Sequence, residues 1–141
     1  MRVSLVTPDA SFYDGEATKV VLPAWDGELG ILPHHAPLIA RLGYGVTRVH
    51  DGKQDHHFAV YGGFLKVQDD VVTILAGGAQ AAEGTLQAAR EAHAGAAKEL
   101  AALRETKGGA PAEMAALEER VKRAQAYVRL LETDKVPAPQ T

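Results

Sequence analysis

The β-rich character of this chain is clearest in one stretch near its centre, Val46-Thr47-Arg48-Val49-His50-Asp51-Gly52-Lys53-Gln54-Asp55-His56-His57-Phe58-Ala59-Val60-Tyr61. Two β-prone runs flank the dipeptide Asp51-Gly52, which favours a tight hairpin turn. Shorter runs of the same kind occupy residues 2–7, 18–22, 64–68 and 71–75, with turn residues between them. Strands of about five residues with frequent turns are typical of an antiparallel sandwich or barrel.

From Thr85 onward the apolar residues recur in steps of three and four, the pattern of an amphipathic helix. Thr85 is a suitable N-cap for a helix that ends at Lys107, before Gly108-Gly109, and Pro111 suits the first turn of a second helix. The short link predicts an antiparallel hairpin. Alanine fills 17 of the 48 positions in 79–126, so the seam between the helices buries little apolar surface. We expect this hairpin to be stable when docked and marginal alone.

The predicted fold is therefore α+β and mainly β. An N-terminal antiparallel β-sandwich occupies residues 1–82, and a C-terminal antiparallel α-helical hairpin occupies residues 83–134. Residues 135–141 are expected to form a flexible tail.

Composition excludes several classes of protein. The 141 residues contain no Cys, which excludes disulfides, thiolate metal sites and a Cys nucleophile. No apolar run approaches the roughly 18–20 residues that a membrane span needs. The net charge of −3 gives no broad attraction to nucleic acid. This charge lies entirely in residues 1–80, and the remainder of the chain is neutral. The sequence has no P-loop, no G-x-G-x-x-G and no G-x-S-x-G motif, so we predict no catalytic residue and no enzymatic activity of its own.

Three groups of residues are candidates for function. Residues 26–38 are rich in Gly and Pro and form either an ordered loop between sheets or a contact loop that presents Asp26 and Glu28. The histidines of the first half, His34, His35, His50, His56 and His57, lack the spacing of a metal site, and we predict none. The second helix carries four cations that form either a solvated face or a site for an acidic partner: Arg120, Lys122, Arg123 and Arg129.

Gly27-Glu28-Leu29-Gly30-Ile31-Leu32-Pro33-His34-His35-Ala36-Pro37-Leu38 resembles the G-E-(L/M)-G-I-L-P-G-H-A-P-L segment of the epsilon subunits of bacterial F-type ATP synthases. Residues 61–67 and 71–76 resemble that family's G-G-F-L-E-V and V-T-I-L-A strands. The resemblance covers nearly the whole chain, although the helices match in pattern more than in residues. Position 34 is His where the family has Gly, so we expect a local difference in the backbone.

The resemblance implies a β-sandwich, a helical hairpin and a non-catalytic place in the rotor, bound to the gamma subunit and the c ring. It implies that Glu28 touches the c ring and that His35 lies at the rotor interface, with Asp26 and Gly27 as loop neighbours. The membrane would be reached only through these partners, at the cytoplasmic face of the bacterial plasma membrane. Nucleic acid is not an expected partner. The alternative from a different class is a free-standing β-sandwich binding module whose hairpin recruits another partner.

The resemblance also implies that the hairpin regulates ATP hydrolysis. Folded on the sandwich it permits hydrolysis, and extended along gamma it blocks the catalytic head, where cations of the second helix meet acidic segments of the alpha and beta subunits. Some members bind ATP through an I/L-D-x-x-R-A motif and arginines of the second helix. Here Leu86, Arg90 and Arg123 match, but Gln87 replaces the Asp and Tyr127 replaces an Arg. We therefore expect ATP binding to be weak or absent, and no other cofactor.

Overall fold

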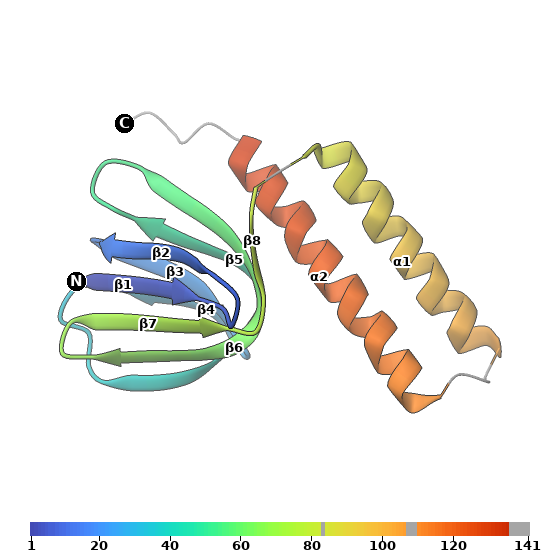
Figure 1. The fold of residues 1–141 in the computed structure, drawn as a ribbon, viewed down its shortest axis with the longest axis horizontal. Helices are drawn as coiled ribbons and strands as arrows, with labels where there is room; N and C mark the ends of the chain where they lie inside the picture. Colours follow the sequence, from blue (N-terminus) through green and yellow to red (C-terminus); the bar gives the residue numbers. More distant parts are fainter. Residues whose placement is uncertain (83, 107–109, 136–141) are drawn as a thin grey trace.

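A computed structural model of the chain describes residues 1–82, 84–106 and 110–135 (Figure 1). Its strands are β1 (Arg2–Val6), β2 (Ser11–Glu16), β3 (Lys19–Ala24), β4 (Gly27–Ile31), β5 (Leu38–His50), β6 (Asp55–Gln68), β7 (Val71–Ala76) and β8 (Ala79–Ala81). Two helices follow, α1 (Leu86–Thr106) and α2 (Pro111–Lys135). The predicted helix stop at Lys107–Gly109 and all but the first residue of the predicted tail lie outside the described residues.

The strands form one sheet in the order β2-β1-β7-β6-β5-β3-β4, with β8 on β6. Neighbouring strands pair antiparallel, as predicted, except for β1 and β7, which are parallel. The hairpin around Asp51-Gly52 joins β5 to β6, and these strands of 13 and 14 residues are much longer than the predicted runs. Their length lets the sheet curl around a single core (Figure 1).

The prediction that residues 57–61 and 64–68 are separate strands was wrong, because both belong to β6. Gly62 and Gly63 join them with φ angles of 71° and 122°, which favour glycine. A Cβ atom at Gly63 would lie 2.1 Å from the carbonyl oxygen of Leu75. The glycine pair therefore lets β6 bend while β7 packs directly against its backbone.

The prediction of a loop over residues 26–38 was also wrong in part. Residues Gly27–Ile31 are the edge strand β4, which pairs with β3. Two glycines lower the intrinsic β propensity of this segment, and the strand forms because β3 supplies its partners. Residues 11–16, for which no strand was predicted, form β2 against β1.

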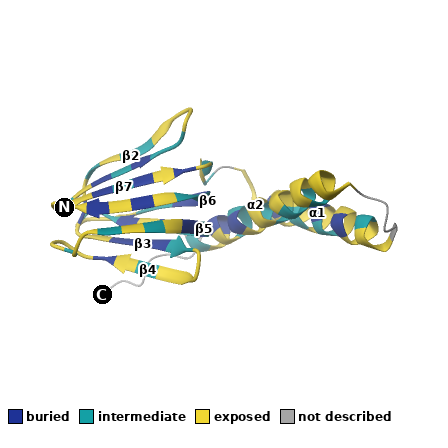
Figure 2. Cartoon of the chain, turned by 90° about the horizontal axis from the view of Figure 1, so that it is seen from below, coloured by how far each residue is buried: buried dark blue, intermediate teal, exposed yellow. Residues whose placement is uncertain are grey.

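The sandwich has a hydrophobic core of its own. Its buried members all lie between residues 3 and 76 and are Val3, Leu5, Ala17, Val20, Leu22, Ile31, Leu42, Val49, Phe58, Val60, Leu65, Val67, Val72, Ile74 and Ala76. No residue of the described helices belongs to this cluster. The sandwich is therefore built to fold without the hairpin, whereas the hairpin is largely exposed (Figure 2).

The helices form the predicted antiparallel hairpin. The hydroxyl of Thr85 accepts a hydrogen bond from the backbone N–H of Ala88 at 3.2 Å, as expected of an N-cap. Three ion pairs run between the helices in opposite chain directions: Arg90–Glu132, Arg120–Glu99 and Arg104–Glu118. The seam is thin, because two of the three most buried α1 residues on it are Ala89 and Ala96.

Helix α2 has a second buried face that the sequence pattern did not reveal. Ala126 and the fully buried Leu130 pack on Ala59 and Tyr61 of the sandwich, whereas the buried Leu131 is not part of this cluster. The second helix therefore lies between α1 and the sheet and holds the hairpin to the sandwich.

Candidate functional surfaces

The turn between β3 and β4 presents the predicted contact residues Asp26, Gly27 and Glu28. Ala24 pairs with Gly27 and Pro23 with Glu28, so the two-residue turn is formed by Trp25 and Asp26. Gly27 has a φ of 139°, which only glycine adopts readily. Asp26 and Glu28 are exposed, and the Trp25 side chain next to them is 70% exposed. The turn thus offers two carboxylates and an indole ring at one end of the β3–β4 strand pair.

His35 does not lie with these residues. It follows the other end of β4, where the backbone N–H of His34 donates a 2.8 Å hydrogen bond to the Asp70 carboxylate. That bond lowers the pKa of Asp70. His34 has a φ of 65°, the left-handed conformation that a glycine at this position adopts without strain. The predicted contact set therefore divides into two groups at opposite ends of β4.

The outer face of β5, β6 and β7 carries an exposed apolar stripe, which we define as Ile39, Phe64, Leu75 and Val71. Their side chains are 74%, 56%, 52% and 41% exposed. Phe64 pairs directly with Leu75, and Ile39 pairs with Lys66, diagonal to Phe64. These positions alternate along each strand with core residues, so they share one face of the sheet.

This apolar stripe was not identified as a site from the sequence. A signal for the stripe was present in the alternation of inward and outward residues along the strand. Phe64 precedes the inward Leu65, so it takes an outward position, where a polar residue is expected. Arg41 pairs with Phe64 and Lys66 with Ile39, so basic side chains border the apolar residues. Ile39, Phe64 and Leu75 are neighbours, and Val71 lies on the same face of β7 beyond Thr73. Contiguous exposed apolar groups with a polar border are typical of protein-binding surfaces.

The histidines form local pairs with carboxylates. His50 Nδ1 lies 2.6 Å from Asp55 Oδ1, and His56 Nε2 lies 2.8 Å from Asp51 Oδ2. The His56 contact and two backbone N–H donors hold the pKa of Asp51 well below its ordinary value. Among the described residues, no group of three His, Cys, Asp or Glu side chains is placed to hold a metal ion.

The hairpin is held to the sandwich by a polar cluster beside the Ala126–Leu130 contact. Glu119 of α2 accepts a 3.0 Å hydrogen bond from the Tyr44 hydroxyl and pairs with Arg123 at 2.9 Å. The Arg123 guanidinium carbon lies 4.9 Å from the centre of the Tyr61 ring, a cation–π arrangement. The Tyr61 hydroxyl in turn donates to the side-chain oxygen of Gln80.

This cluster shifts the pKa values of its members. The Tyr44 hydrogen bond and the Arg123 charge lower the pKa of Glu119. Burial raises the pKa of Tyr44, and the Glu119 carboxylate raises it further. Burial also raises the pKa of Tyr61 to about 12, although the charge of Arg123 opposes the shift. Docking therefore favours an ionised Glu119 and two neutral tyrosines.

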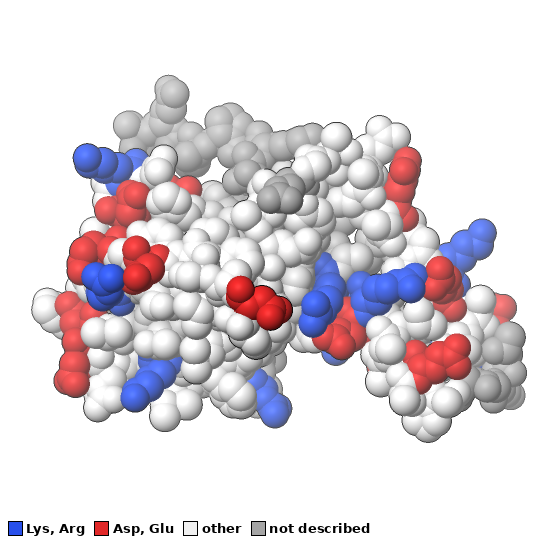
Figure 3. All heavy atoms as spheres, in the orientation of Figure 1, with Lys and Arg blue, Asp and Glu red and all other residues white. Residues whose placement is uncertain are grey.

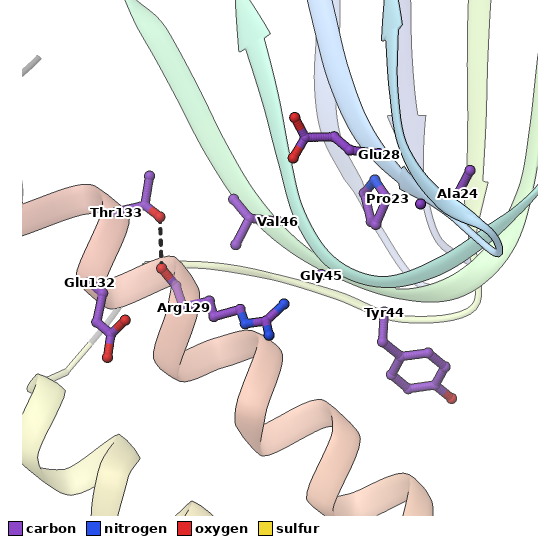
Figure 4. Close-up of a pocket in the computed structure, with 10 residues that line it drawn as sticks. Pro23, Ala24, Glu28, Tyr44, Gly45, Val46, Arg129, Glu132 and Thr133 are labelled. Atoms are coloured by element: carbon purple, nitrogen blue, oxygen red, sulfur yellow. Dashed lines mark hydrogen bonds between the residues drawn. The ribbon is translucent and has the colours of Figure 1, made fainter.

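The four predicted cations of α2 lie in different surroundings. Arg120 pairs with Glu99 of α1 at 2.6 Å, and the Lys122 ammonium lies 5.7 Å from the centre of the Tyr44 ring. Arg123 belongs to the cluster described above. Arg129 lines a cavity of about 430 Å³ together with Glu28 (Figure 4). Figure 3 shows cations and carboxylates interspersed where the hairpin meets the sandwich.

The residues that resemble a nucleotide motif are not all together. Leu86 and Arg90 line a shallow cavity at the start of α1 with Gln87 and Glu91. Arg90 pairs with Glu132 at 3.2 Å. Arg123 is not among the residues that line this cavity, because it lies over the Tyr61 ring.

The fold, a β-sandwich with a docked helical hairpin, and the similarity of the sandwich to a known family define the class of this protein. The family model described as "ATP synthase, Delta/Epsilon chain, beta-sandwich domain" matches residues 1–82. The chain therefore belongs to the delta/epsilon chain family of ATP synthases.

The curated relatives point to the epsilon chains within this family. The ATP synthase epsilon chain of Alkalihalophilus pseudofirmus is 49% identical over 80 residues, which cover 57% of this chain and 60% of that one. The chloroplastic ATP synthase epsilon chain of Cyanidioschyzon merolae is 41% identical over 101 residues, which cover 71% of this chain and 77% of the relative. The chain thus spans about 60% of the length of the first of these relatives.

Solved structures share the fold. A chain of the Euglena gracilis mitochondrial ATP synthase, in a structure of OSCP, F1 and c ring, matches with a TM-score of 0.73 at 20% identity, over 94% of this chain and 79% of that chain. A chain of the Tetrahymena thermophila mitochondrial ATP synthase central stalk and c ring matches with a TM-score of 0.60 at 16% identity, over 93% and 96% of the two chains. The hairpin as well as the sandwich is therefore part of a known arrangement.

Proposed function

We propose that this chain is a non-catalytic central-stalk subunit of an F-type, proton-translocating ATP synthase, which couples the gamma subunit to the c ring. The observation that carries the proposal is the apolar stripe of Ile39, Phe64, Leu75 and Val71, whose side chains stay exposed when the hairpin is docked. Partner burial of such a stripe supplies the binding energy that a rotor subunit needs. Membership of the delta/epsilon chain family supports the same role.

The test is co-purification with gamma. Phe64→Glu and Leu75→Glu place a charge in the stripe and should abolish binding while the sandwich still folds. Lys53→Glu, in the β5–β6 loop, is the matched control and should bind normally. A monomer of the unchanged chain without affinity for gamma would refute the proposal and leave the free-standing binding module.

Two further contacts belong to the proposal. The β3–β4 turn, with Asp26, Gly27 and Glu28, would touch the c ring, and His35 would lie at the rotor interface beyond the other end of β4. Both contacts hold the protein at the membrane through its partners, at the cytoplasmic face of a bacterial plasma membrane. In the described part of the chain, neither helix is long and apolar enough to span a membrane.

The hairpin would regulate ATP hydrolysis by detaching from the sandwich. Its docking rests on a small apolar contact and one polar cluster, which is compatible with two states separated by a few kcal/mol. Once detached, Arg120, Lys122, Arg123 and Arg129 would be available to acidic segments of the alpha and beta subunits. In the docked state two of these cations, Arg120 and Arg123, are already paired with carboxylates of this chain.

We further propose that ATP is not a strong ligand of the docked hairpin. Leu86 and Arg90 lack an acidic neighbour at position 87, and Arg123 is engaged with Glu119 and Tyr61. Titration calorimetry with ATP should show no binding at micromolar concentrations. Micromolar binding that is lost in Arg90→Ala would contradict this.

A further inference from the structure

The cavity between the sandwich and α2 brings together residues of two different proposed contacts. Its sandwich wall includes Glu28, and its helix wall includes Arg129, Glu132 and Thr133 (Figure 4). Glu28 belongs to the turn proposed to touch the c ring, and Arg129 belongs to the helix proposed to detach. The cavity has a volume of about 430 Å³ and is open to solvent on one side.

The charges that face this cavity favour an attraction across it. Glu28 and Arg129 have opposite charges and lie on opposite walls. Glu132 is the other carboxylate of the cavity, but Arg90 of α1 pairs with it at 3.2 Å and offsets its charge. Among the described residues, Arg129 forms no ion pair, and neither does Glu28. Their attraction therefore acts through solvent, at a separation larger than that of a salt bridge.

We propose that Glu28 and Arg129 couple the ring contact to the docking of the hairpin. The Glu28 carboxylate stabilises the docked α2 through Arg129. A basic or hydrogen-bond-donating group of the ring that engages Glu28 withdraws this stabilisation and favours detachment of the hairpin. The proposal rests on the ring contact proposed above and states how that contact would regulate the hairpin.

The lack of direct contact between Glu28 and Arg129 limits the size of the effect. Exposed opposite charges that are not in direct contact contribute less than a surface ion pair in contact, so the change in the docking equilibrium constant is at most about five-fold. Such a change is small for a folded domain. It still changes the detached fraction of a hairpin whose two states lie within a few kcal/mol of each other.

The chain allows a direct measurement of docking because it contains no Cys. Ala126 is 3% exposed in the docked interface, so a cysteine in the variant Ala126→Cys is labelled by a thiol reagent only after the hairpin detaches. The labelling rate then reports the detached fraction. All experiments use the full chain in this background.

A double-mutant cycle tests the coupling. Glu28→Gln and Arg129→Gln should each raise the labelling rate measurably, by up to about five-fold, and the double variant should match the single ones. An unchanged rate in either single variant would overturn the proposal. Asp9→Asn is the matched control, because Asp9 is an exposed carboxylate between β1 and β2 that does not line the cavity. It should leave the rate unchanged. Independent effects that multiply in the double variant would overturn the proposal.

A second measurement separates this proposal from the ring contact itself. In the complex assembled with gamma, addition of the c ring should raise the labelling rate of the cysteine at position 126 when residue 28 is Glu. The same addition should leave the labelling rate unchanged in the Glu28→Gln complex. If the cycle in the isolated chain shows coupling but the ring has no effect, the proposed ring contact is wrong. If the ring acts equally on wild-type and Glu28→Gln complexes, the coupling through Glu28 is wrong.

Discussion

The contact between Leu130 and the sandwich gives a sharp prediction, because this side chain is fully buried in the interface of α2 with Ala59 and Tyr61. Leu130→Ala should weaken docking by about 2–4 kcal/mol, the usual cost of such a truncation. Since each 1.4 kcal/mol is a factor of ten, the equilibrium constant for detachment should rise about 30- to 800-fold. The sandwich should melt at an unchanged temperature, because no described helix residue belongs to its core.

The assay is the labelling rate of a cysteine at position 126, combined with thermal unfolding of the sandwich. Leu131→Ala is the matched control, because Leu131 is 4% exposed but is not part of the apolar cluster that joins α2 to the sandwich. It should loosen the seam between the helices and change the labelling rate far less. Equal effects of the two variants, or no effect of Leu130→Ala, would refute the view that this small contact holds the hairpin in place.

Three further predictions concern single residues. Gly63→Ala should destabilise the sandwich by at least about 2–3 kcal/mol in chemical denaturation, because the new Cβ meets the Leu75 carbonyl and φ is 122°; unchanged stability would show that β7 packs differently. Thr47→Val should raise the free energy of unfolding by about 1–2 kcal/mol, since the fully buried Thr47 hydroxyl has no hydrogen-bond partner among the described residues; a lower melting temperature would point to a hidden partner. Docking should weaken as the pH falls below 4.5, because the pKa of Glu119 is lowered in the docked state and its contribution is lost as the carboxylate is protonated; a Glu119→Gln variant that retains the same pH dependence would assign it to another group.

Much of the fold could be predicted because the relevant signals are local. The alternation in residues 46–61 reflects burial of one strand face, and the three-and-four spacing after Thr85 reflects one buried helix face. The parallel pairing of β1 with β7 could not be predicted, because it joins segments far apart in the chain. Strand β4 contains two glycines and was predicted as a loop, since its structure depends on β3 rather than on its own propensity.

Of the candidate surfaces, the sequence predicted only the one that lies in a recognisable sequence motif. Glu28 was found through a motif, with Asp26 and Gly27 as its loop neighbours, and the three residues do lie together at an exposed turn. The second buried face of α2 was missed, because Ala126 and Leu130 form a short pattern offset from the longer seam stripe. The cavity shared by Glu28 and Arg129 depends on how the hairpin docks, which no local pattern in the sequence contains.

The central claim is that the sandwich couples the rotor and the hairpin restrains hydrolysis. The most direct test compares ATP hydrolysis and ATP-driven proton transport by a reconstituted complex that contains either the full chain or the chain without residues 85–141. The account predicts that removal of these residues raises hydrolysis and leaves proton transport coupled, because the sandwich keeps its own core. Unchanged hydrolysis would show that the hairpin is not an inhibitor. Loss of coupled transport would contradict the assignment of rotor coupling to the sandwich.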